Sequence, residues 1–216
     1  MSIVLRCAGL VLIVGLAACA GTPASIYYSL RNPVPEATSQ NAAARDAGSS
    51  KAYAVSVQSV KVPQQVDRPQ IVVSDEASAQ VYVLESYLWA APLSDEIRAA
   101  LSAALQQRLG VFDLALTQLP DHMPAWKVAV TIQRFESVYD RHVTLSASWV
   151  IDPVNQTGKK SMVCGTSVTV PVQGTGVGAL VQSHRQALDD VARMIASGLK
   201  GGSVDGRQAS SAAMCA

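Results

Sequence analysis

The fold of this chain is decided by the stretch His142-Val143-Thr144-Leu145-Ser146-Ala147-Ser148-Trp149-Val150-Ile151. Apolar side chains occupy every second position from Val143 to Ile151, and polar side chains fill the positions between them as far as Ser148. Because successive side chains of a strand point to opposite faces, this period of two predicts a strand with one buried face and one polar face. A sheet that leaves one face polar in this way is typical of antiparallel pairing.

Other parts of the chain show strand-like patterns over shorter lengths. These segments are 26–30, 53–57, 71–73, 81–88, 112–116, 128–132 and 162–172. The polar residues 74–78 predict a hairpin between two of them, and residues 155–158 predict a turn after Ile151.

A first helix is predicted from Ser94 to Gly110. Its apolar stripe consists of Ile97, Leu101, Leu105 and Leu109, with Ala100 and Ala104 beside it. Ser94 is a candidate N-cap and Gly110 a candidate C-cap. Asp95 and Glu96 suit the positive end of the helix dipole.

A second helix is predicted to open at residues 174–178, with its apolar stripe at Val177, Val181, Leu188, Val191 and Ile195. Strands interrupted by two helices, without strict alternation, predict one α+β domain over residues 26–200, with a mainly antiparallel sheet and two principal helices. Within it, residues 32–50 form a predicted polar loop. The small residues of 201–216 predict a disordered tail.

The first nineteen residues have the order of a bacterial export signal. Arg6 supplies a positive start, and the apolar run from Leu10 to Leu16 is too short to cross a bilayer. Small residues then precede Cys19, which resembles the lipobox cysteine that bacterial lipoproteins modify with diacylglycerol and a further acyl chain. We therefore predict a signal peptide over residues 1–18 and a lipidated tether over residues 19–25, with several acyl chains as a stable anchor. The alternative is an ordinary secretory signal whose cleavage site happens to precede Cys19.

Composition narrows the classes of partner. Removing residues 1–18 from the 216 leaves 198, enough for one domain, and leaves 16 basic and 16 acidic residues. Because there is no basic excess, nucleic-acid binding is not expected.

Cys164 falls in phase with the apolar residues of a strand and is expected to be a small buried hydrophobe, whereas Cys215 lies in the tail. A bond between these two cysteines is a less favoured alternative, because the tail would have to reach inward.

Residues capable of chemistry are not grouped in the pattern of a known site. His122, His142 and His184 lack metal-site spacing. His184 lies on the stripe of the second helix, which favours a packed, hydrogen-bonded histidine over a functional one. Residues 174–179 fit Gly-x-Gly-x-x-Ala, but no second strand carrying an acid follows, so a turn into a helix is favoured over a dinucleotide site. We therefore expect no catalytic residue, no metal and no cofactor.

Three motifs occur in order behind the predicted lipid site. They are Tyr27-Tyr28-Ser29-Leu30, Asp67-Arg68-Pro69-Gln70-Ile71-Val72 and Trp89-Ala90-Ala91-Pro92-Leu93. In this arrangement the chain resembles the ABC-type transport auxiliary lipoproteins. The resemblance implies an outer-membrane lipoprotein facing the periplasm, which works beside an MCE-domain protein and an ABC permease in moving lipids between two membranes.

The resemblance therefore predicts a non-enzymatic docking component that binds copies of itself or the MCE protein. Five residues in these motifs carry the resemblance to the family. They either contact a partner or shape the fold. They are Arg68, Pro69, Gln70, Trp89 and Pro92. Likewise Tyr82, Tyr87, Trp89 and Trp126 are either interface residues or core residues. The alternative function is a lipoprotein that itself carries a lipid in a cavity.

Overall fold

The computed structural model describes residues 24–31, 53–201 and 213–216. The predicted signal peptide over residues 1–18, Cys19, the loop at 32–50 and residues 202–212 of the tail lie outside the described residues. In the described part, no helix is long and apolar enough to cross a membrane.

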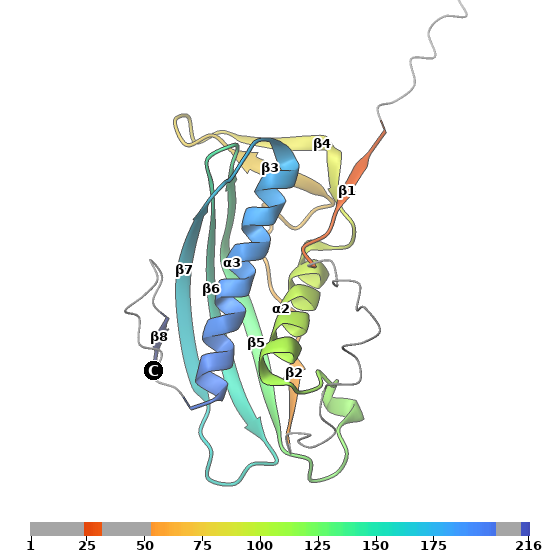
Figure 1. Cartoon of the computed structure of the whole chain (residues 1–216), viewed down its shortest axis with the longest axis vertical. Coiled ribbons are helices and arrows are strands. Elements are labelled where there is room, and N and C mark those ends of the chain that lie inside the picture. The colour runs from red at the N-terminus through yellow and green to blue at the C-terminus, as the bar shows by residue number, and fades with distance from the viewer. Residues whose placement is uncertain (1–23, 32–52, 202–212) are drawn as a thin grey trace, which may run out of the picture.

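The structure consists of one mixed sheet with two long helices packed on one of its faces (Figure 1). The elements in chain order are β1 (Ile26–Tyr28), β2 (Ala54–Val57), β3 (Gln70–Ser74), β4 (Val81–Trp89), α2 (Leu93–Leu109), the 3₁₀ helix η1 (Leu116–Gln118), β5 (Ala125–Val138), β6 (His142–Val154), β7 (Met162–Pro171), α3 (Gly176–Leu199) and β8 (Met214–Cys215). The sheet order is β1-β4-β3-β5-β6-β7-β8, and β2 also pairs with β5. This arrangement confirms the predicted α+β class, with two principal helices in a single domain.

Antiparallel pairs dominate the sheet, as predicted. They join β3 to β4, β5 to β6, β6 to β7 and β7 to β8, whereas β1–β4, β2–β5 and β3–β5 are parallel. The long hairpin of β5 and β6 contains a register shift between Ile132 and Arg134. Such a bulge moves the following residues to the opposite face. As a result the buried positions change from even numbers, at Val128, Val130 and Ile132, to odd numbers, at Phe135 and Ser137.

The core lies between the sheet and the helices. Along β6 the predicted stripe from Val143 to Ile151 is buried, with Trp149 only 2% exposed. The predicted stripe of α3 is buried as well. Full burial of one such apolar side chain contributes about 1.5–3 kcal/mol, so this seam between β6 and α3 is a major source of stability.

The first turn of α2 differs from the prediction. The helix begins at Leu93 after Pro92, and Ser94 lies inside it instead of capping it. Proline is well suited to a helix start because its fixed φ and missing N–H cost nothing there. Gly110 ends the helix as predicted, in the left-handed region at φ 65°. Residues 112–116 form no strand, since only Asp113 makes an isolated bridge, to Val55.

The C-terminal residues correct two predictions. Cys164 is not a free buried thiol but forms a disulfide with Cys215. The end of the predicted disordered tail is ordered, because Met214–Cys215 pairs antiparallel with β7. Ala216 and Val163 exchange two main-chain hydrogen bonds of 2.9 and 3.2 Å. The edge of β7 supplies main-chain groups that need partners, and the tail satisfies them.

Candidate functional site

The segment that follows the predicted tether is fastened to the body of the protein by a buried acid. Glu96, in the first turn of α2, is 5% exposed. Its Oε2 accepts hydrogen bonds from the Ser29 hydroxyl and from the Leu30 main-chain N–H, both at 2.7 Å. Leu30 itself is 1% exposed, so the chain is held by apolar packing as well as by a carboxylate.

A basic residue holds the same segment from the second helix. The guanidinium of Arg185, on α3, donates from Nε and Nη2 to the Ser29 carbonyl oxygen at 3.1 and 2.7 Å. Ser29 therefore lies between Glu96 and Arg185, one from each helix. We call Ser29, Leu30, Glu96 and Arg185 the clasp. The clasp therefore joins the N-terminal segment to both helices.

Four of the five motif residues lie near the clasp: Pro69, Gln70, Trp89 and Pro92. The Trp89 N–H donates to the Pro69 carbonyl at 2.8 Å, Gln70 pairs with Leu88, and Pro92 directly precedes α2. The main chain of β4 is linked onward to β1, since the Ala90 N–H donates to the Tyr28 carbonyl at 2.7 Å. The structure therefore brings the three sequence motifs together where β1, β3 and β4 meet the start of α2.

These residues divide into two kinds. Trp89 is 4% exposed and packs edge-on against Phe135, with ring centroids 6.1 Å apart, so it shapes the fold. The side chains of Arg68, Pro69 and Pro92 are exposed, and that of Gln70 is half-buried. Only this second group is placed to contact a partner. Cys19 lies outside the described residues.

The other aromatic candidates separate in the same way. Tyr87 and Trp126 are half-buried and pack against the core, and Tyr87 lies 6.3 Å from Tyr28 between ring centroids. Tyr82 is 48% exposed. Of Tyr82, Tyr87, Trp89 and Trp126, Tyr82 alone is an exposed residue.

His184 belongs to the core, as predicted. Its ring stacks on Phe135 with centroids 4.0 Å apart, and its Nε2 lies 2.8 Å from the Ser137 hydroxyl. Burial lowers the pKa of His184 to about 3, so the ring is neutral near pH 7. Among the described residues, no group of three or more His, Cys, Asp or Glu is arranged to hold a metal ion.

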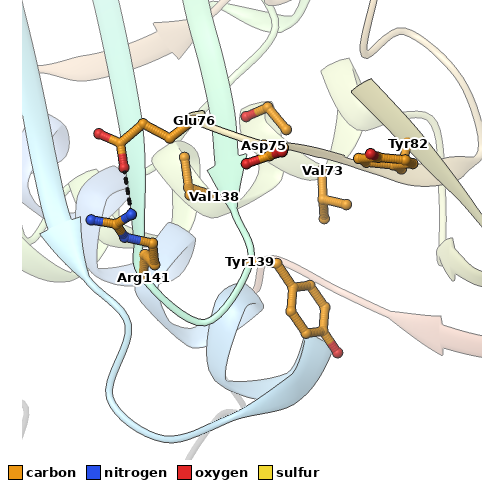
Figure 2. A pocket seen from close by; sticks show the side chains of 8 residues that line it. Val73, Asp75, Glu76, Tyr82, Val138, Tyr139 and Arg141 are labelled. Carbon is orange, nitrogen blue, oxygen red and sulfur yellow. Dashed lines mark ion pairs between the residues drawn. The ribbon is translucent and has the colours of Figure 1, made fainter. Parts of the chain in front are cut away.

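Two open hollows lie beside the β3–β4 hairpin. The smaller, of about 230 Å³, is lined by Val73, Tyr82, Val138, Tyr139 and the ion pair of Arg141 with Glu76, whose charged atoms are 3.1 Å apart (Figure 2). The larger, of about 430 Å³, shares residues 73–76 and continues along β5 past Arg134 and Glu136. Both hollows are open and mix apolar side chains with charged ones, including Asp75 and Glu76 in each, whereas acyl chains need an apolar enclosure.

Comparison with known proteins identifies the class of the chain. The model of the family described as "ABC-type transport auxiliary lipoprotein component" matches residues 28–196, from the end of β1 to the last turn of α3. The chain belongs to this family. It is therefore a transport-associated lipoprotein, and the family is not a known enzyme family.

Two solved structures resemble this auxiliary lipoprotein in fold. One is an uncharacterized protein with 21% identity and a TM-score of 0.60, matched over 82% of this chain and 99% of its own. The other is a Xanthomonas campestris protein with 17% identity and a TM-score of 0.57, over 81% of this chain and 95% of its own. A search of curated proteins finds no match.

The sequence did not single out the clasp. From its position in the sequence, Glu96 is only a favourable charge at the helix start, and Arg185 belongs to no motif. One signal was available, because Glu96 directly precedes Ile97 of the buried stripe, and a carboxylate at the edge of such a stripe needs a partner.

Proposed function

We propose that this auxiliary lipoprotein is the outer-membrane docking component of an MCE-type ABC system that moves lipids between two membranes. In this proposal acyl chains on Cys19 attach the domain to the membrane, and its body faces the periplasm. Ala20 and Gly21, which follow the cysteine, include no aspartate of the kind that retains lipoproteins at the inner membrane.

The clasp is the observation that carries the proposal. A long flexible linker would leave the domain free to diffuse around its anchor, whereas the clasp ties the N-terminal segment to both helices at Ser29 and Leu30, ten and eleven positions after Cys19. Pro69 and Pro92, both exposed, belong to the segments that meet β1 there, since the Trp89 N–H donates to the Pro69 carbonyl and Pro92 directly precedes α2. Arg68 is the exposed neighbour of Pro69 in the chain. A partner that bound there would be held close to the membrane, as a docking component requires.

Anchoring also favours assembly. Copies confined to one membrane plane have a raised effective concentration, so weak contacts between them can build a closed homo-oligomer around the MCE protein. The alternative of a lipid carrier finds less support, because the space between sheet and helices is filled by the core and both hollows are open and lined in part by charged side chains.

Capture of the full-length lipidated chain from cross-linked cell envelopes tests the proposal. We expect an antibody to the chain to bring down the MCE-domain protein and the ABC permease, in an outer-membrane density fraction. Arg68→Ala combined with Pro92→Ala should reduce this yield, whereas Lys160→Ala, at the far end of the molecule in the exposed β6–β7 turn, should not. Recovery of the chain with bound phospholipid and neither partner would contradict docking and favour the carrier.

A further inference from the structure

Exposed apolar side chains gather at one end of the molecule. Among the large exposed apolar residues that the structure describes, one set of five lies on β1, on β4 and in the β5–β6 turn: Ile26, Tyr27, Val81, Tyr82 and Tyr139, at 43–63% exposed. Figure 1 shows these three elements at the same end, which is also where the N-terminal segment enters the fold. Three of the five are tyrosines.

Four of the five residues lie on the two strands at one edge of the sheet, β1 and β4, and Tyr139 lies in the β5–β6 turn. Val81 and Tyr82 begin β4, and Ile26 pairs with Tyr87 near the end of that strand. Tyr139 and Tyr82 line the same hollow (Figure 2). With a rise of about 3.3 Å per residue, the row along β4 extends for roughly 25 Å.

Chain length limits which surface can cover this row. Six residues separate Cys19 from Ile26, and a chain extends by at most about 3.6 Å per residue, so the anchor lies within roughly 25 Å of β1. If Cys19 carries lipid, as the proposed function requires, the membrane surface lies no more than roughly 25 Å from β1, where this row begins. The membrane is the one partner that the chain would hold at that distance through a covalent attachment of its own.

Tyrosine suits this position chemically. Its ring is apolar and its hydroxyl is polar, so it is favoured at the boundary between acyl chains and water. The charges nearby do not favour anionic lipid, because Asp75 and Glu76 in the β3–β4 turn and Glu85 on β4 are acidic, and Arg141 is already paired with Glu76. We propose that this end of the domain, with Ile26, Tyr27, Val81, Tyr82 and Tyr139, rests on the headgroup region of a zwitterionic bilayer.

The proposal is tested with the chain that begins at Cys19, coupled through that thiol to a maleimide phospholipid in phosphatidylcholine vesicles. Cys164 and Cys215 are joined to each other and do not compete for the maleimide. Coupling supplies the anchor chemically, so the result does not depend on natural lipidation or on an MCE partner. Tyr82→Trp and Tyr139→Trp each introduce a fluorophore at the proposed surface, and Phe112→Trp, 72% exposed outside the proposed surface, is the matched control.

Brominated phosphatidylcholine should quench most of the emission that Tyr82→Trp and Tyr139→Trp add to the parent signal. Emission added by Phe112→Trp should be unchanged, and anionic lipid should not increase the quenching. Equal quenching at all three positions, or none at Tyr82→Trp and Tyr139→Trp, would overturn the proposal. Protection of both positions in a larger species without lipid quenching would also overturn it, and would assign the row to contact between copies.

Discussion

Replacement of Glu96 by alanine should release the N-terminal segment from the helices and destabilise the domain. The substitution removes two 2.7 Å hydrogen bonds to a charged acceptor and leaves the Leu30 N–H buried without that partner. Hydrogen bonds to charged groups contribute about 1.5–3 kcal/mol each, and water at half-buried Ser29 can replace part of one. We therefore expect a loss of about 2–4 kcal/mol in the free energy of unfolding.

Urea unfolding measures the loss, and hydrogen exchange locates it. In Glu96→Ala the amides of Tyr28 to Leu30 should exchange much faster than in the parent, while those of β6 should change only in proportion to global stability. Glu85→Ala, which removes an exposed glutamate from β4, is the matched control and should cost less than about 0.5 kcal/mol.

A double-mutant cycle separates the clasp from general damage. Ser29→Ala and Glu96→Ala should be coupled by about 1 kcal/mol, because the two side chains share one hydrogen bond. If Glu96→Ala is no more destabilising than Glu85→Ala, and residues 28–30 stay protected, the reasoning about the clasp is refuted.

Three further results are expected. Trp149→Ala should cost about 3–5 kcal/mol in urea unfolding because the side chain is 2% exposed, and a cost equal to that of Ser148→Ala would mean that the faces of β6 are assigned wrongly. Burial lowers the pKa of His184 to about 3, so near pH 5 the unfolded chain binds a proton at this residue that the folded chain does not. This one group should therefore lower the free energy of unfolding by about 2 kcal/mol between pH 7.5 and pH 5. His184→Gln should lose that part of the pH dependence and His142→Gln should keep it. Reduction of the Cys164–Cys215 disulfide, which closes a loop of 51 residues, should cost up to about 4 kcal/mol, and reductant should have no effect on Cys164→Ala/Cys215→Ala.

Elements whose faces differ strongly in polarity were predictable from the sequence. The alternation from Val143 to Ile151 and the stripe from Val177 to Ile195 depend on residues near each other in the chain, so strand and helix follow from local spacing. The prediction for β2 was less accurate. Its residues Ala54–Val57 are buried on both faces, whereas the alternation of larger Val55 and Val57 with small Ala54 and Ser56 is typical of a strand with one buried face. Burial on the second face depends on tertiary packing that local spacing does not encode.

The candidate site depends on long-range contacts and was only partly predictable. The three family motifs meet near the clasp, but the clasp itself joins Ser29 to residues 67 and 156 positions away. The disulfide likewise requires that the tail return to the edge of β7, which no local pattern near Cys215 indicates. The start of α2 shows the limit of single-residue signals, since Ser94 has the right chemistry for a cap and lies two residues too late to provide it.

Binding of the purified chain to the MCE-domain protein of its own cell is the most direct test of the docking function. The chain is attached to a supported bilayer through Cys19, and the MCE protein is passed over it. We expect saturable binding that Arg68→Ala combined with Pro92→Ala weakens about tenfold or more, or about 1.4 kcal/mol, while Lys160→Ala leaves it unchanged. Absence of binding, together with a phospholipid found in native mass spectra of the chain, would contradict the docking account.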